Sequence, residues 1–581
     1  MYITVQRIKR KNGKIAEYLQ MVESYREKGK VKKKVIANLG NKEVLQSQFH
    51  SLMKLLNPSL LKEEKAVEAL SSASYGVIYL VHHLFSELGL WNLLDKNVRS
   101  KGFADRVAIL VANRLSNPRS EHGLAGWLEQ VYGCTRDGER MLPVWKQQRR
   151  VKVDLNWLQP FYRTLDGLIS NKEEIELHLY HRLKDLFSLK VETVFYDLTS
   201  TYFEGNGPQD MAQYGYSRDG HPQNKQILVG VVMANDFPIS HYIFRGNLID
   251  HQSVQQVIED VSRRFEIQRT IWVGDRGMLT TDNVDRLKKQ GQGYLMGLVR
   301  RRREDVIAHI EAIKGAGREC KGGITQQEKK DSFKTYAWEV KGREEGVRVI
   351  VVHSEERAAY ETAMREKCMV KVKKDLEALK KRVERGKIKK KERIGYCAGK
   401  ILAKHKGTRY YAWNISGQQE FDYFEHPNLE REKKIEGKYL IQTEEKELGM
   451  EEAVKQYKEL SEVERGFRSM KDVLELRPIF HRKAERVKAH IFVAALSLLL
   501  ERIIERKLKK HSSLLSVRDT LDALATIGVV EFDVNGQKKR GVTAGTSRAR
   551  AVLSALEIHK ISLPEKSAEN AICGHYKPPC S

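Results

Sequence analysis

The sequence predicts a multidomain α/β protein centred on a mixed five-stranded sheet with helices. Strand-like segments and one amphipathic helix alternate between residues 191 and 300, and helical apolar periodicity fills residues 75–190. The chain has 581 residues, whereas a single hydrophobic core stops growing at roughly 250–300 residues. Its hydrophobic fraction of 41% is ordinary for a folded protein. Several folded domains are therefore expected.

The charge of the chain indicates a polyanionic partner. Lys and Arg number 103 against 76 Asp and Glu, which gives a formal net charge of +27. Nucleic acid is the first candidate partner, and an anionic membrane surface is the second. The longest apolar run, Ala489 to Leu500, is too short to cross a bilayer, and the N-terminus has no apolar signal-peptide core. We expect a cytoplasmic protein without a membrane segment.

The six cysteines are too few and too scattered to form a disulfide framework. We expect reduced thiols. Cys573 and Cys580, with His575 between them, have the composition of half a zinc site, but no second ligand pair accompanies them. The alternative, a flexible end, is the more economical interpretation.

Residues 1–50 predict a small, basic, antiparallel β unit. Short segments of alternating apolar and polar residues are separated by turn signals at Asn12-Gly13 and at Gly29. The many lysines and arginines allow this unit to lie on DNA. Hairpins with solvated faces explain the same pattern equally well.

Residues 75–190 predict a helical DNA-binding domain. Two periodic stretches, Ala104 to Leu115 and Gly123 to Val131, are separated by a break at residues 117–121 in which Ser120 can cap the second helix. A helix, a short break and a second helix are compatible with a helix-turn-helix, although plain bundles contain the same hairpin. The basic run Lys146 to Lys152 is expected to be a loop.

Residues 191–300 predict the first part of the central sheet, as three strands, a helix and two further strands. The strand from Glu192 to Tyr202 is expected to end in an acid, Asp197, and hydroxyl residues. The strand that begins at Arg269 is expected to end in Asp275. Binding sites of α/β sheets lie at such strand ends. Each aspartate alone is more often a turn or cap residue.

Residues 301–445 predict a β-rich insertion domain, because the interval is far longer than a loop. It contains a lysine-rich helix, Val370 to Lys391, that suits phosphate contact as well as a solvated surface. Residues 446–505 complete the central domain with a helix that carries Glu464. Residues 506–581 are expected to form a C-terminal helical tail.

The helix around Glu464 carries three polar groups at intervals of seven residues. Tyr457, Glu464 and Lys471 fall on nearly one face of an α-helix, with roughly 10 Å between neighbours. Read alone, this is a solvated helix in which Glu464 pairs with Arg468. Together with Asp197 and Asp275, however, Glu464 completes a set of three carboxylates. Such hard oxygen ligands suit Mg2+ or Mn2+, and two such ions support in-line phosphoryl transfer.

The motifs Tyr196-Asp197-Leu-Thr-Ser, Val273-Gly-Asp275-Arg-Gly-Met and Tyr457-x-x-Leu460-x-x-x-Glu464, followed by Lys471, resemble the DDE transposases of bacterial insertion sequences. Within these they resemble the group with a Tyr-Arg-Glu-Lys signature and a β-rich insertion. The resemblance implies an RNase H-like fold, with Asp197, Asp275 and Glu464 as Mg2+ (or Mn2+) ligands and catalytic residues. It also implies that Tyr457 and Lys471 contact transposon-end DNA. The signature arginine is Leu460 here, and Arg468 is a possible substitute.

Four further residues complete the expected DNA-binding set: Arg468, Arg276, His481 and Arg482. A polar loop, residues 216–225, either faces the site or is a plain surface connection. The resemblance implies a homodimer that binds double-stranded DNA, both the terminal inverted repeats and the target. Two alternatives are an RNase H-like nuclease without strand transfer and a non-catalytic DNA-binding regulator.

Overall fold

The protein is described here from a computed structural model. The described residues are 1–564, except 10–14, 28, 48–67, 99, 148–150, 190, 266–268, 276, 279, 299–302, 321–332, 343, 418–419 and 535–536. The chain divides into two compact units, which are described separately. Unit 1 comprises Met1–Ser72 and Val530–Gly541, and unit 2 comprises Ala73–Val529 and the residues from Val542 onward.

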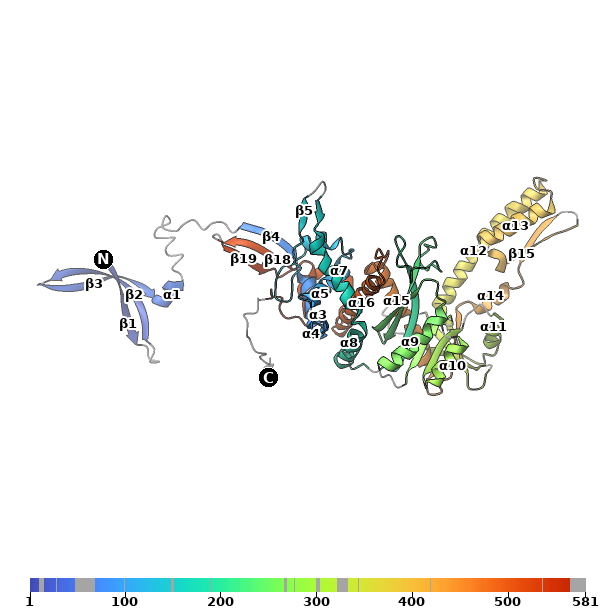
Figure 1. The fold of residues 1–581 in the computed structure, drawn as a ribbon, viewed down its shortest axis with the longest axis horizontal. Helices are drawn as coiled ribbons and strands as arrows, with labels where there is room; N and C mark the ends of the chain where they lie inside the picture. Colours follow the sequence, from blue (N-terminus) through green and yellow to red (C-terminus); the bar gives the residue numbers. More distant parts are fainter. Residues whose placement is uncertain are drawn as a thin grey trace. The chain divides into compact units, whose positions relative to one another are not determined.

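Unit 1 contains an antiparallel three-stranded sheet in the order β1-β2-β3, drawn in dark blue in Figure 1. The turn at Gly29 has a φ of 76°, which favours glycine; the other predicted turn, Asn12-Gly13, lies outside the described residues. A second sheet has the order β19-β18-β4. The bounds are β1 (Tyr2–Lys9), β2 (Ile15–Glu27), β3 (Lys30–Asn41), α1 (Lys42–Ser47), β4 (Glu68–Ser74), β18 (Gly528–Val534) and β19 (Gln537–Val542).

A helical region precedes the large sheet of unit 2. Its centre is α5, most of whose side chains are buried, because it packs against α3, α4, α7 and α16. Asp154 caps α7 by accepting a hydrogen bond from the backbone N–H of Asn156 at 3.0 Å. The bounds are α3 (Gly76–Glu87), α4 (Leu90–Asn97), α5 (Phe103–Ser116), α6 (Leu124–Gln130), β5 (Trp145–Gln147), β6 (Val151–Val153), α7 (Leu155–Ile169) and α8 (Lys172–Phe187).

The centre of unit 2 is a nine-stranded mixed sheet, which confirms the predicted mixed α/β class. Its order is β12-β13-β14-β17-β11-β10-β7-β8-β9, and β10 runs parallel to both β7 and β11. The other neighbours are antiparallel. The bounds are β7 (Thr193–Tyr202), β8 (Gln226–Ala234), β9 (Phe237–Arg245), β10 (Ile271–Asp275), β11 (Gly293–Leu298), β12 (Arg318–Cys320), β13 (Thr335–Lys341), β14 (Arg348–Ser354) and β17 (Lys438–Thr443).

Helices cover both faces of this sheet and so create three layers. On one face, α9 (Asp250–Arg264) and α10 (Thr281–Lys289) pack on Tyr196, Trp272 and Tyr294. On the other face, α15 (Met450–Arg468) and α16 (Ala484–Lys510) pack on Phe195, Val273 and Leu295. Because both faces are covered, every residue of β8 is buried. Burying a polar side chain in such a sheet costs free energy unless it is hydrogen-bonded or paired. Polar residues in this sheet therefore point to a structural or functional role.

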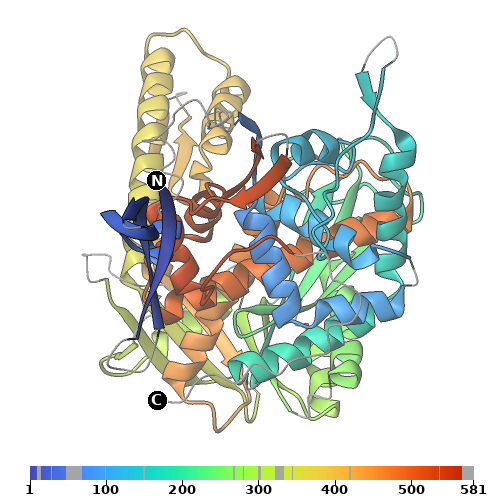
Figure 2. The ribbon, with the colours of Figure 1, turned by 90° about the vertical axis from the view of Figure 1, so that its left-hand side faces the viewer.

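The sheet has nine strands where the sequence predicted five, because strands of the expected insertion domain join it. Residues 355–437 connect β14 to β17. The two ends of this segment are neighbours, because the backbone N–H of Ser354 donates a hydrogen bond to the carbonyl oxygen of Gly437 at 2.9 Å. Between these points α12 and α13 lie side by side, in yellow in Figures 1 and 2, and build a separate small core with β15 and β16. The bounds are α11 (Arg303–Glu311), α12 (Glu355–Glu384), α13 (Lys391–Lys404), β15 (Tyr411–Ile415), β16 (Phe421–Glu425) and α14 (Leu429–Ile435).

The C-terminal region is not only helical as predicted. Besides α17 (Val517–Leu524) and α18 (Ser547–Ala555), it supplies β18 and β19. Within the described residues, no single helix is long and apolar enough to span a bilayer; α3 and α4 meet that criterion only when taken together, and they bend by 78°. The four described cysteines, Cys134, Cys320, Cys368 and Cys397, are free thiols. The candidate zinc half-site lies outside the described residues.

Candidate active site

Two aspartates lie level on adjacent parallel strands. The pairing of β10 with β7 aligns Ile271 with Thr193 and Val273 with Phe195. The same register, continued for two residues, places Asp275 beside Asp197, on strands about 4.8 Å apart. Asp275 ends β10, as predicted. β7 ends at Tyr202, as its predicted span does, so Asp197 lies within the strand and not at its tip, where it was expected.

Helix α15 crosses this face of the sheet and brings Glu464 to the aspartates. The ring of Tyr457 packs against Gly297 of β11, the residue that pairs with Asp275. Nine positions later, Gly466 lies beside Met233 of β8. Nine helical residues rise about 13.5 Å, which matches three strand spacings of about 4.8 Å. Glu464 therefore lies between these points, over β10 and β7.

The electrostatics of Asp197 reflect this convergence. Burial raises the pKa of Asp197 to about 7; a hydrogen bond from the Leu198 backbone N–H and the charge of Arg218 oppose the rise, and Glu464 and Asp275 add to it. Carboxylates gathered in this way repel one another, and a divalent cation relieves that repulsion. An all-carboxylate set of hard oxygen donors fits Mg2+ or Mn2+.

An aromatic pair borders the acids. Tyr439 and Tyr457 stack with ring centroids 5.7 Å apart, and Arg357 lies 5.7 Å from the Tyr439 ring. Burial raises the pKa of Tyr457 to about 12, and Asp275 and Glu464 contribute to the rise. The hydroxyl therefore stays protonated and can donate a hydrogen bond. A cavity of about 400 Å³, lined by Tyr439, Tyr457 and Glu464 among others, opens beside it.

The expected straight line from Tyr457 through Glu464 to Lys471 is interrupted. A π-helical turn, Ser469–Val473, follows α15, and Lys471 lies within it. Its Nζ forms an ion pair with Asp219 Oδ1 at 2.8 Å, and Asp219 also pairs with Arg477. Burial lowers the pKa of Lys471, and the contact with Asp219 opposes that shift.

Comparisons with known proteins identify the family of the chain. Residues 192–500, more than half of the chain, match the family described as the transposase DDE domain. Residues 4–66 match the N-terminal domain of IS1634 family transposases. The chain belongs to the DDE transposases of insertion sequences. The piggyBac transposase, solved as a synaptic complex with hairpin DNA, is similar with a TM-score of 0.32 and 10% identity over 78% of each chain. No curated protein matches the transposase.

The polar loop at residues 216–225 of the transposase faces the acids, an orientation that the sequence left open. The backbone N–H of Arg218 donates to Ser200 Oγ at 2.8 Å, and the Arg218 charge lowers the pKa of Asp197. The next residue, Asp219, holds Lys471. Sequence reasoning missed Arg218, Asp219 and Arg477 as site residues. For Arg218 and Asp219 the signal was the density of polar residues in this loop; Arg477 lies outside the loop, and the sequence carried no signal for it.

The other expected DNA contacts lie in different surroundings. Leu460 is 9% exposed and packs in the core, so it offers no phosphate contact, whereas Arg468 is exposed at the end of α15. Arg482 is exposed. Arg276 lies outside the described residues.

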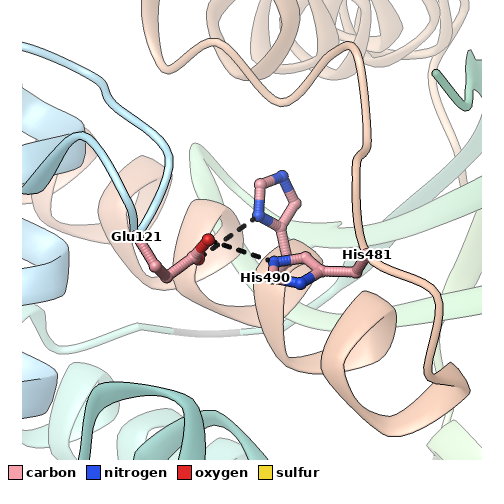
Figure 3. A group of neighbouring side chains, drawn as sticks. All are labelled: Glu121, His481 and His490. Carbon is pink, nitrogen blue, oxygen red and sulfur yellow. Dashed lines mark ion pairs between the residues drawn. The ribbon is translucent and has the colours of Figure 1, made fainter. Parts of the chain in front are cut away.

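His481 belongs to a buried polar network (Figure 3). Its Nε2 lies 3.3 Å from Glu121 Oε2, and His490 Nδ1 lies 3.8 Å from Glu121 Oε1. Burial alone would raise the pKa of Glu121, but its contacts with the two imidazoles hold it well below its usual range. Arg114 donates to His490 Nδ1 at 3.0 Å. Three ligand-type side chains meet here, but the guanidinium occupies the nitrogen that a metal would need. Burial lowers the pKa of His490 to about 4, so we interpret the network as a polar link between α16 and the loop before α6.

Replacing Asp197 by Asn is expected to raise the melting temperature of the metal-free transposase above neutral pH. The folded pKa of Asp197, about 7, exceeds the ordinary aspartate value of 3.8. The folded state therefore holds a proton that the unfolded state releases, and stability falls as the pH rises from the unfolded to the folded value. Thermal unfolding in EDTA at about pH 5 and about pH 8 measures the difference.

Asp282→Asn, at an exposed position on α10, is the control and should keep the pH dependence of the wild type. An Asp197→Asn variant whose melting temperature falls with pH as steeply as that of the wild type would contradict the prediction.

Proposed function

We propose that this transposase cuts the DNA ends of its element and joins them to target DNA by Mg2+-dependent, two-metal phosphoryl transfer. Asp197, Asp275 and Glu464 would hold the ions, for which Mn2+ is the alternative. The observation that carries the proposal is the level placement of the two aspartates beneath the helix that bears Glu464. Bound ions of this kind activate the attacking hydroxyl and stabilise the leaving oxygen.

The sheet order also supports an RNase H-like assignment. Three consecutive antiparallel strands, β7 to β9, are followed by α9 and by β10, which returns parallel to β7; α10 and the parallel β11 come next. This mixed arrangement of five strands and two helices is compatible with the RNase H-like core that the family resemblance implies. It places one acid inside the first strand and the second at the tip of the fourth.

The residues around the acids would position the DNA phosphate. The Tyr457 hydroxyl is a protonated donor next to Asp275 and Glu464. Lys471 has three N–H donors, so it can keep its bond to Asp219 and still donate to a phosphate oxygen. Arg468, exposed on the last turn of α15, supplies a further cation. Fixed donors at this place hold the scissile phosphate in line with the attacking oxygen.

Cutting and joining two ends of one element requires two catalytic centres, so we propose a homodimer on double-stranded DNA. The DNA would comprise the terminal inverted repeats and the target. The net charge of +27 supports such extensive phosphate contact. Sedimentation of the transposase with end DNA is expected to give a complex that contains two copies of the chain.

The deciding experiment supplies pre-cleaved end DNA and a supercoiled target plasmid to the purified transposase. With Mg2+, plasmid molecules covalently joined to the end DNA are expected, and EDTA should abolish them. Nicked end DNA without joined products would instead indicate a nuclease without strand transfer. Specific binding without any metal-dependent nicking would indicate a DNA-binding regulator.

A further inference from the structure

The N-terminal sheet of unit 1 has two chemically different faces. Side chains alternate between the faces of a strand, and the strand register assigns each residue to one face. The amide face carries Gln6, Gln20, Ser24, Arg26, Lys33 and Asn38, interspersed with apolar residues that include Tyr2, Val22, Val31 and Val35. The carboxylate face carries Arg7, Glu17, Glu23, Glu27, Lys32 and Lys34. Among the described residues of the three strands, only Val22 is buried, so neither face is covered by a core.

The carboxylate face mixes cations with acids. All three acidic residues of the sheet lie on it, because they occupy odd-numbered positions of β2. Glu17 accepts from Arg7 Nε at 2.9 Å and from Lys42 Nζ at 2.6 Å, and Glu27 accepts from Lys32 Nζ at 2.6 Å. Lys34 lies level with Glu23. Lys30 also lies on this face, level with Glu27, so the cations outnumber the acids, but a phosphate placed here would meet carboxylates as well as cations.

The amide face has cations without carboxylates and an ordered row of amides. Gln20 Nε2 donates to Gln6 Oε1 and to Asn38 Oδ1, each at 2.6 Å. These bonds fix the three side chains across all three strands. Within the described part of the chain, the Gln6 and Asn38 amide nitrogens donate no hydrogen bond. Lys33 and Arg26 are exposed on the same face.

We propose that the amide face reads base edges in the major groove of the element's end DNA, and the proposal rests on the function proposed above. The outer strands lie about 10 Å apart, comparable with the groove width of about 12 Å. Gln and Asn side chains pair with adenine edges, and amides held in one row present a fixed pattern of donors. Lys33 and Arg26, which no acid of this face neutralises, contact the flanking phosphates.

Neighbouring lysines on opposite faces provide the first test. The full-length transposase is titrated in EDTA, without catalysis, against a labelled duplex that carries the inverted repeat flanking its gene. A random duplex of equal length and composition is the reference probe. Lys33→Ala is expected to weaken binding to both duplexes several-fold and to reduce the salt slope by about 1. Lys34→Ala removes the same charge from the carboxylate face and should change little. Equal losses for the two variants would overturn the assignment of the face.

The amide row provides the second test, because it concerns specificity. The double variant Gln6→Ala with Asn38→Ala is expected to lower affinity for the repeat duplex roughly ten- to hundredfold while affinity for the random duplex stays constant. Ile3→Ala, an exposed truncation on the other face of β1, is the matched control. An unchanged ratio of the two affinities would overturn the proposal, as would variants that alter the oligomeric state instead of DNA binding.

The two proposals fail in distinguishable ways. Loss of sequence-specific binding in the amide variants, combined with an absence of strand-transfer products from the wild type, would leave DNA reading intact and remove the catalytic proposal. If the wild type performs strand transfer but the amide variants keep normal specificity, the catalytic proposal stands and the proposal about the amide face fails.

Discussion

Asp197→Asn is expected to abolish end cleavage and strand transfer while leaving the binding of end DNA intact. Asparagine keeps the shape of the side chain but removes the charge that the ions require. Removing a residue that only hydrogen-bonds to a metal ligand already lowers metal affinity or activity about 10–100-fold. The loss of a ligand itself should therefore lower the cleavage rate by more than about a hundredfold. Asp275→Asn and Glu464→Gln should behave alike. Cleavage is measured on labelled end DNA with Mg2+, and binding is measured in EDTA.

Matched controls lie on the same elements of the transposase. Glu451→Gln changes an exposed glutamate on α15, the helix of Glu464, and Asp282→Asn changes an exposed aspartate on α10. Both should retain near wild-type cleavage. If any one of the three acid variants cleaves at a near-normal rate, the assignment of the metal ligands is wrong.

Gly297→Ala is expected to reduce cleavage by about a hundredfold, because small displacements of catalytic groups have effects of that size. A methyl group on Gly297 would overlap the Tyr457 hydroxyl oxygen and lie 2.7 Å from its Cζ. Tyr457 would have to move, and α15 would shift Glu464 with it. Overpacking of this kind costs about 1–3 kcal/mol of stability, which denaturant unfolding can measure alongside the cleavage rate.

A double-mutant cycle separates this clash from a general loss of stability. Tyr457→Phe removes the atom nearest to the added methyl group, so Gly297→Ala should cost less in that background. Gly399→Ala is the control, since it lies exposed in α13 with open space around it; it should raise stability by about 0.5–1 kcal/mol. Additive losses at Gly297 and Tyr457 would contradict the proposed contact.

The central strands could be predicted from the sequence because their signals are local. Continuous apolar segments predicted the mixed sheet, and the motifs around Asp275 and Glu464 directed attention to residues that the fold brings to one face. The extent of the sheet could not be predicted, because β14 and β17 pair with residues far away in sequence. The position of Asp197 inside β7 has the same origin, since the hydroxyl residues that follow it remain paired with β8.

The residues that contact the site residues could not be predicted from neighbouring sequence either. The ion pair of Lys471 with Asp219 joins residues 252 positions apart, and the contact of His481 with Glu121 joins two distant segments. The π-helical turn that contains Lys471 arises in a sequence that reads as regular helix. Spacing along the chain predicted which residues are chemically suited to the site, but tertiary packing decided which atoms they face.

The backbone hydrogen bond between Ser354 and Gly437 has an evolutionary consequence. Because the chain departs and returns at neighbouring positions, everything from α12 to α14 can be lengthened, shortened or exchanged without altering the spacing of the strands that carry the aspartates. Related elements can therefore diversify this arm while preserving their chemistry, and a short turn grafted in its place should leave the remaining sheet intact.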